Sequence, residues 1–121
     1  MTCGVSMARY DFSNAVKGDT FDGVLFTLTL NGVAIDLTGA TIIMDLRLTK
    51  TGTSVERFTS VADEHITISA TPTDGTFTFN DQIIDVDAAD YFYDIQITFA
   101  DDTVKTYIYG RWTVIQDVTY N

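Results

Sequence analysis

The sequence has few of the residues that cross-link or catalyse: one cysteine, one proline and one histidine among 121 residues. A lone cysteine, Cys3, forms no intrachain disulfide, which excludes a disulfide-stapled secreted scaffold. No basic leader precedes an apolar run, and no stretch approaches the ~18 apolar residues of a membrane span. We therefore expect a protein that folds in a cytoplasm and has no membrane partner.

Positive charge is also scarce, with 7 Lys plus Arg against 17 Asp plus Glu and a net charge of −10. Such a chain repels phosphate backbones and anionic lipid, so nucleic acid is not expected as a partner. The hydrophobic content of 45% and the mean hydropathy of +0.10 nevertheless predict a folded core. We expect one domain over residues 9–118, with tails at 1–8 and 119–121.

Apolar side chains recur at every second position, which is typical of half-buried strands. Within residues 24–30 one face carries Val24, Phe26, Leu28 and Leu30. Residues 41–50 repeat the pattern, with an inward face of Ile42, Met44, Leu46 and Leu48. Asn31-Gly32 between these runs is a strong turn signal. The alternation predicts an all-β protein.

A long hairpin is predicted over residues 91–115. Its first strand has an inward face of Tyr91, Tyr93, Ile95, Ile97 and Phe99. The turn contains Asp101-Asp102 where Asn-Gly would be easier, which predicts local strain or a loop longer than two residues. Gly110 in the second strand predicts a β-bulge.

Asp87, Ala89 and Tyr91 reproduce the D-x-A-x-Y spacing that precedes strand F of immunoglobulin-like sandwiches. There the tyrosine hydroxyl bonds back to upstream backbone; the alternative is a chance string in an Asp-rich chain. Turns every 8 to 12 residues agree with a sandwich of about 100 residues. We predict an immunoglobulin-like Greek-key β-sandwich of about seven to eight antiparallel strands.

Four short motifs, mostly at expected turns, follow one another along the chain. They are Gly18-Asp19-Thr20, Asn31-Gly32, Asp36-Leu37-Thr38-Gly39 and the run from Asp90 to Ile95. In this order they resemble the small Ig-like N-terminal domain of tailed-phage baseplate upper proteins and of related phage head-fibre and tail-fibre proteins. The resemblance implies a virion structural protein, made in the bacterial host cytoplasm, that docks to other virion proteins and forms a homo-oligomer.

Catalytic constellations are not evident in the sequence. His65 is the only histidine, and only Ser60 and Ser69 stand near it, without the glycines of a nucleophile elbow. A lone histidine at a strand edge is more often a solvated residue than a base. We predict a protein that is not an enzyme and that holds no cofactor.

Four aspartates, Asp81, Asp85, Asp87 and Asp90, lie within one loop and offer hard oxygen ligands for calcium. Their spacing does not match an EF-hand. The competing interpretation, a solvated acidic turn that caps the corner, is favoured because acidic loops usually are solvated. No metal site is therefore predicted, although these four residues are the candidates.

Tyr107, Tyr109 and Arg111 alternate along the last strand, and Tyr and Arg often anchor interfaces. Either they form an interface stripe, or a bulge at Gly110 resets the parity and places them in the core. Open sheet edges offer a second route to assembly by strand addition.

Three classes of function follow from these observations. The first is a phage assembly or attachment module of a baseplate, tail or capsid fibre, and this is the class we favour. The second is a carbohydrate- or host-surface-binding module, whose mark would be a shallow groove lined with tyrosines and acidic groups. The third is an enzyme, which the residue search disfavours.

Overall fold

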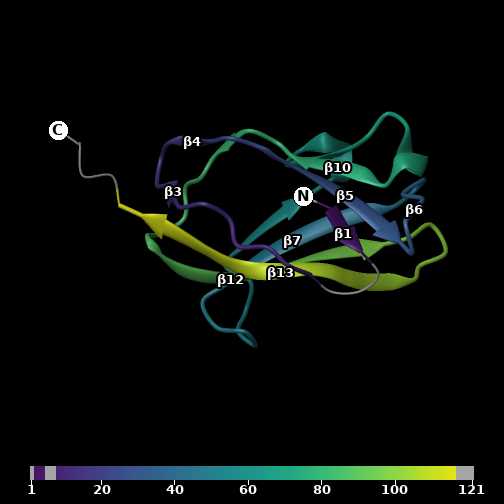
Figure 1. Ribbon diagram of the computed structural model, residues 1–121. Coiled ribbons are helices and arrows are strands. Elements are labelled where there is room, and N and C mark those ends of the chain that lie inside the picture. The colour runs from purple at the N-terminus through teal and green to yellow at the C-terminus, as the bar shows by residue number, and fades with distance from the viewer. Residues whose placement is uncertain (1, 5–7, 117–121) are drawn as a thin grey trace.

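The computed structural model describes residues 2–4 and 8–116, and its architecture is all-β, as predicted (Figure 1). Two larger sheets face each other in a sandwich-like arrangement, with the apolar side chains between them. The described residues contain thirteen strands, more than the seven to eight predicted, because several pieces of two or three residues pair separately. The helical residues described form two short 3-10 turns, η1 (Val61–Asp63) and η2 (Pro72–Asp74).

The first sheet has five strands in the order β1-β5-β10-β9, with β6 also pairing with β5. The bounds are β1 (Thr2–Gly4), β5 (Val24–Leu30), β6 (Val33–Ala34), β9 (Ile66–Ile68) and β10 (Thr76–Phe79). Strand β1 runs parallel to β5, opposite residues 27–29. The prediction of a tail over residues 1–8 is therefore wrong for β1, which gains backbone pairing from the sheet.

The second sheet has six strands in the order β2-β13-β12-β7-β8, with β3 also pairing with β13. The bounds are β2 (Ala8–Arg9), β3 (Ala15–Val16), β7 (Thr41–Arg47), β8 (Glu56–Thr59), β12 (Ala89–Thr98) and β13 (Val104–Ile115). Strands β4 (Thr20–Phe21) and β11 (Gln82–Ile83) form a separate two-stranded sheet. The predicted tail at 119–121 lies outside the described residues.

The predicted alternation places the core correctly along most of its length. Phe26, Leu28, Ile42, Met44 and Leu46 are all fully buried, as are the inward residues of β12. The pattern fails at strand ends. Leu30 and Leu48 were expected inside but are about half exposed, at 47% and 55%, because β5 ends at Leu30 and β7 ends one residue before Leu48.

The hairpin between β12 and β13 has the long turn that was predicted, but its bulge is at another residue than predicted. Its turn spans residues 99–103, longer than two residues, and Asp102 adopts a positive φ of 68°, as the Asp-Asp pair indicated. The bulge is not at Gly110, which pairs in register with Tyr93. Instead, Ile95 faces Ile108 and Gln96 faces Thr106, so Tyr107 is the extra residue.

Gly110 instead makes room for residues 10–13, which we call the N-terminal segment and which lie against β13. A β-carbon at position 110 would collide with the carbonyl oxygen of Tyr10, which accepts a hydrogen bond from the hydroxyl of Tyr93. Burial raises the pKa of Tyr93, so this hydroxyl stays protonated and donates. Trp112 also donates its indole N–H to the carbonyl of Ser13 at 2.9 Å. Glycine thus lets the N-terminal segment lie close against β13.

The tyrosine at the start of β12 behaves as its spacing predicted. Tyr91 is 1% exposed, and its hydroxyl donates to the carbonyl oxygen of Asp87 at 2.5 Å. Ala89 lies between them, paired with Val114 of β13. The bond fixes the loop that enters β12.

Candidate functional site

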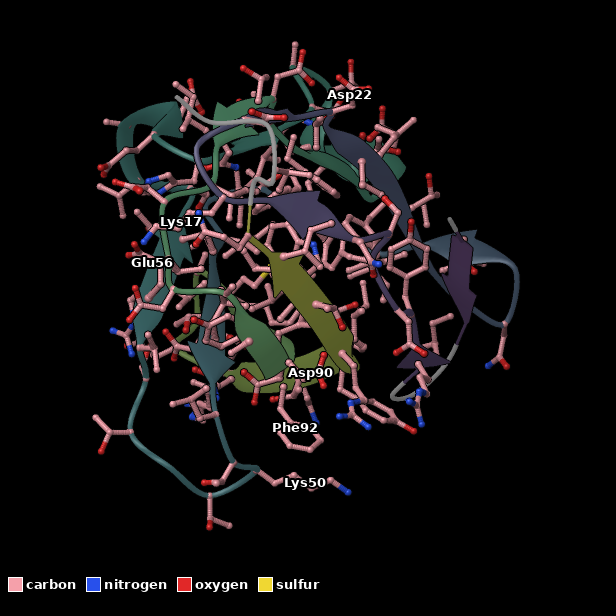
Figure 2. All side chains as sticks on the ribbon, turned by 90° about the vertical axis from the view of Figure 1, so that its left-hand side faces the viewer. Lys17, Asp22, Lys50, Glu56, Asp90 and Phe92 are labelled. Atoms are coloured by element: carbon pink, nitrogen blue, oxygen red, sulfur yellow. The ribbon has the colours of Figure 1, made fainter. Side chains whose placement is uncertain are left out.

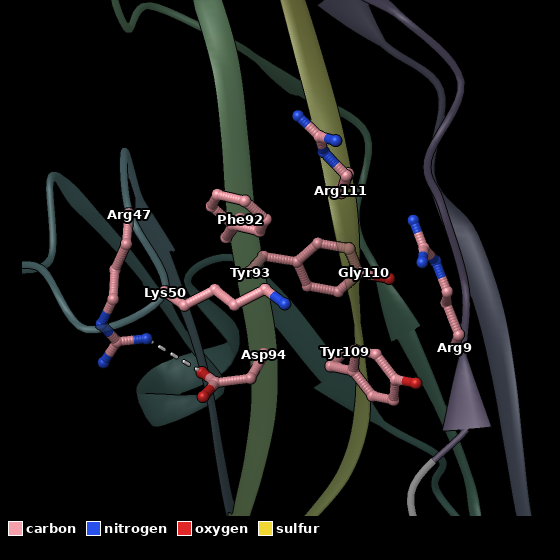
Figure 3. A pocket seen from close by; sticks show the side chains of 9 residues that line it. All are labelled: Arg9, Arg47, Lys50, Phe92, Tyr93, Asp94, Tyr109, Gly110 and Arg111. Carbon is pink, nitrogen blue, oxygen red and sulfur yellow. Dashed lines mark hydrogen bonds and ion pairs between the residues drawn. The ribbon is translucent and has the colours of Figure 1, made fainter.

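A hollow with a volume of about 460 Å³ lies on the outer face of the six-stranded sheet. We name it the cationic pocket (Figure 3). It is lined by Arg9, Arg47, Lys50, Phe92, Tyr93, Asp94, Tyr109, Gly110 and Arg111. Figure 2 shows Phe92 and Lys50 projecting from the outer side of this sheet, away from the opposite layer. The pocket is therefore a surface feature and not a gap in the core.

Sheet geometry explains why these side chains converge. On β12 the core residues Tyr91 and Tyr93 point inward, so Phe92 and Asp94 must point outward. Phe92 pairs with both Arg47 of β7 and Arg111 of β13, which places one arginine on each strand that neighbours β12. Strand β2 supplies Arg9, and the turn that follows β7 supplies the fourth cation, Lys50.

Two of the cations face the ring of Phe92. The guanidinium carbon of Arg111 lies 5.0 Å from the ring centroid, and the Lys50 ammonium lies 5.7 Å from it. Cations at such distances are attracted to the negative face of the ring. The ring therefore holds two positive charges at the mouth of the pocket.

The other two cations are tied to carboxylates. Arg47 contacts Asp94 at 3.3 Å and Asp45 at 3.3 Å, and Figure 3 shows the first of these pairs across the pocket wall. Arg9 contacts Asp11 at 3.2 Å. The backbone N–H of Arg111 bonds to Asp11, and with the side chain of Arg9 it lowers the pKa of that carboxyl. Both arginines are thereby held in place.

The alternation that turns Met44 and Leu46 inward places Asp45 on the opposite face of β7, yet it is the one buried charged side chain described, at 6% exposure. Arg57 contacts it at 2.8 Å and Ser54 donates to it at 3.1 Å. Burial alone would raise the pKa of Asp45, but the hydrogen bonds from Arg57 and Ser54 and the charge of Arg47 outweigh it and lower the pKa. Asp45 therefore stays ionised, and its carboxylate fixes the position of the Arg47 guanidinium.

The structure divides the predicted stripe of Tyr107, Tyr109 and Arg111. Tyr109 is 39% exposed and, with Arg111, lines the cationic pocket. Tyr107 packs against the core and meets Phe99 edge-on at 6.4 Å. The bulge at Tyr107 itself, and not one at Gly110, causes this division.

His65 has a structural position. Its Nδ1 accepts a hydrogen bond from the backbone N–H of Thr59 at 3.2 Å, and its ring lies edge-on to Phe58. Ser60 accepts from the backbone N–H of Ile42, and Ser69 donates to Asp74. Both serines thus serve local backbone and turn structure.

The four calcium candidates are engaged separately. Asp81 accepts the backbone N–H of Gly23, Asp87 pairs with Lys17 at 3.3 Å, and Asp90 accepts the hydroxyl of Thr113 at 2.6 Å. Asp85 is exposed. Among the described residues no group of three or more His, Cys, Asp or Glu is placed to hold a metal ion. The candidate calcium cluster is therefore not formed.

Sequence reasoning found Tyr109 and Arg111 but missed the other half of the pocket. Phe92 and Arg47 carried a usable signal, because both occupy outward positions in strands whose inward faces are apolar. Arg9 and Lys50 carried none, since only the pairing of β2 with β13 and the turn after β7 bring them close.

No family model matches the chain, and no curated protein sequence matches it. Within the described residues no helix has the length and apolar character needed to cross a membrane.

Proposed function

We propose that the chain is a non-enzymatic assembly module, an immunoglobulin-like domain of a bacteriophage particle that docks to other virion proteins. The observation that carries the proposal is the outer face of the six-stranded sheet, where Phe92, Tyr109 and Arg111 surround an open hollow. Aromatic and Arg side chains grouped at a surface hollow are the usual anchors of protein interfaces.

Strand pairing supports the immunoglobulin-like part of the proposal. The order β5-β10-β9 corresponds to strands B-E-D of such a sandwich, and β7-β12-β13 corresponds to C-F-G. The bond from Tyr91 to the carbonyl of Asp87 has the position and direction of a tyrosine corner. The phage setting is supported by the motif order from residue 18 to residue 95, which resembles the baseplate and fibre domains.

Docking through the sheet face is favoured over strand addition at the sheet edges. Edge strand β9 has only three residues, and edge strand β8 begins with the charged pair Glu56 and Arg57. Short and charged edges are the features by which proteins prevent edge-to-edge pairing. We therefore place the contact with virion partners, or between copies in a homo-oligomer, on the face.

A carbohydrate- or host-surface-binding module is the second candidate. It is favoured by the open pocket with Tyr109 and Asp94 in its wall, since a ring and a carboxylate together suit a sugar. It ranks second because Lys50 and Arg111 already lie over the ring of Phe92 and leave less free aromatic surface for a sugar.

The test is mass spectrometry of particles purified from a bacterial lysate in which the chain is produced with its phage. Detection at many copies per particle is expected, and absence from the particle would overturn the virion assignment. A glycan array and light scattering on the purified chain separate the two candidates. Self-association without glycan binding favours assembly, whereas a monomer that binds a glycan favours the second function.

A further inference from the structure

We propose that the cationic pocket binds an acidic segment of a partner polypeptide through its carboxylates, with Lys50 and Arg111 as the main contacts. This inference rests on the proposed function as an assembly module and names the chemistry of the partner. It is independent of the particle in which the chain works.

Positive charge is scarce in this chain and unevenly distributed. The chain has only 7 Lys plus Arg and a net charge of −10. Four of the seven, Arg9, Arg47, Lys50 and Arg111, nevertheless line this one pocket. They come from β2, β7, the turn after β7, and β13, so three strands and a turn bring them together. A gathering of scarce cations at a single hollow defines a local anion site on an acidic protein.

Two of these four positive charges are already paired with carboxylates. Arg9 is paired with Asp11, and Arg47 is paired with Asp94 and Asp45. Within the part of the chain that the structure describes, Lys50 and Arg111 form no ion pair within 4.0 Å. The charge of Arg111 does act on Asp11, but neither side chain is held in a direct ion pair, so Lys50 and Arg111 can both meet the carboxylates of a ligand.

The aromatic ring of Phe92 pre-positions the Lys50 and Arg111 side chains. The ring of Phe92 lies beneath both free cations, at 5.0 Å from the guanidinium of Arg111 and 5.7 Å from the ammonium of Lys50. The Lys50 ammonium points toward the centre of the pocket in Figure 3. Side chains placed before binding lose less conformational entropy when the ligand arrives. A volume of about 460 Å³ accommodates a short piece of chain with its carboxylates.

The charge around the pocket suits an acidic peptide better than other candidate ligands. A duplex nucleic acid presents a long line of phosphates, which would meet the acidic remainder of this surface. A short acidic segment feels mainly the local cations, because charges beyond about 8 Å are screened at physiological ionic strength. A neutral sugar would leave Lys50 and Arg111 without counter-charge. The charge pattern therefore favours a carboxylate-bearing peptide.

The test uses an N-acetylated hexaglutamate peptide, added to the full chain labelled with ¹⁵N and followed by NMR. We expect the peptide to shift backbone amides around Phe92, Asp94 and Arg111, and to bind more weakly as salt rises. A hexaglutamine peptide is the matched ligand control and is expected to leave these amides unchanged.

Two double variants with equal loss of charge separate the pocket from the general surface. Lys50→Gln with Arg111→Gln is expected to weaken hexaglutamate binding at least about tenfold. Lys17→Gln with Lys105→Gln, outside the pocket, is expected to change it less than about twofold. Lys50, Arg111 and Lys105 are exposed, and Lys17 is partly exposed and gives up one surface ion pair with Asp87, so both doubles are expected to fold, and their melting curves check this.

The inference is overturned if hexaglutamate does not bind at low salt, if hexaglutamine binds equally, or if both double variants lose affinity alike. Binding of an oligogalacturonate without binding of the peptide also overturns it, in favour of an acidic glycan. Its failure is distinct from that of the proposed function. If the chain is found in particles but does not bind the peptide, only this inference is wrong. If the chain binds the peptide but is absent from particles, only the virion assignment is wrong.

Discussion

At the scale of single residues, a few polar groups fix positions that the apolar pattern leaves open. Tyr91, Tyr93 and Trp112 are buried aromatic residues, and each donates its polar hydrogen to a backbone carbonyl. A buried polar group without a partner costs free energy, so these bonds select one arrangement of the loops that accept them. The side chains therefore contribute both to the core and to the path of the chain.

Tyr91→Phe tests the bond to the carbonyl of Asp87. The phenyl ring retains the packing of Tyr91 but loses the donor, so we expect the free energy of unfolding to fall by about 1 kcal/mol. Urea denaturation measures it. Tyr109→Phe on the exposed face is the matched control and is expected to be neutral. Equal stability of Tyr91→Phe and the unaltered protein would contradict the role of this hydroxyl.

Asp45→Asn tests the buried carboxylate. The pKa of Asp45 is lowered in the folded protein, so its ionised form contributes stability at neutral pH, and this contribution is lost as the pH falls through the folded pKa. We expect the variant to lose about 1–3 kcal/mol at pH 7, since Arg57 and Ser54 lose a charged acceptor.

The check on Asp45→Asn is a set of urea titrations at descending pH. The difference from the unaltered protein is expected to begin to shrink below the unfolded pKa of about 3.9 and to vanish only below the lowered folded pKa, where both proteins carry a neutral group at position 45. A difference that stays constant down to the lowest measurable pH would show that ionisation of Asp45 contributes nothing.

At the scale of elements, alternation in the sequence predicted the long strands well, because one face of β5, β7 and β12 is buried and the period of two shows it directly. The alternation did not predict features that depend on contacts between distant parts of the sequence. The bulge at Tyr107 and the pairing of β1 with β5 arise from neighbours far away in the sequence, which no local period records.

Dependence on distant contacts also explains why only part of the cationic pocket was predicted. Tyr109 and Arg111 lie on one strand, so their alternation was visible in the sequence. Arg9 and Lys50 reach the pocket only through the parallel pairing of β2 with β13 and the turn that follows β7. A site assembled across strands needs the sheet order, and the sheet order depends on the whole fold.

Gly110→Ala tests the contact between β13 and the N-terminal segment. A β-carbon there would lie 2.8 Å from the carbonyl carbon of Tyr10, so the segment must shift, and we expect a loss of about 1–3 kcal/mol. Trp112 fluorescence is expected to change as well, because its indole bonds to Ser13. Lys105→Ala, exposed on the same strand, is the control. Unchanged stability and fluorescence in Gly110→Ala would show that the segment is not packed against β13.

At the scale of the whole molecule, one apolar core has to offset the self-repulsion of a chain with a net charge of −10. The charge is unevenly placed, since the cationic pocket gathers four of the seven basic residues and leaves most of the remaining surface acidic. Repulsion among exposed carboxylates favours expansion of the chain and is weakened by salt. Stability should therefore depend on ionic strength.

We expect the melting temperature to rise by a few degrees when NaCl is raised from about 10 mM to about 150 mM, which shortens the screening length from about 30 Å to about 8 Å. Differential scanning calorimetry measures this rise. The Lys17→Gln, Lys105→Gln double variant changes the net charge from −10 to −12, so its melting temperature should depend on salt more steeply than that of the unaltered chain. If added NaCl lowered the melting temperature instead, the ion pairs of Asp45 and Asp94 would outweigh the repulsion of the acidic surface.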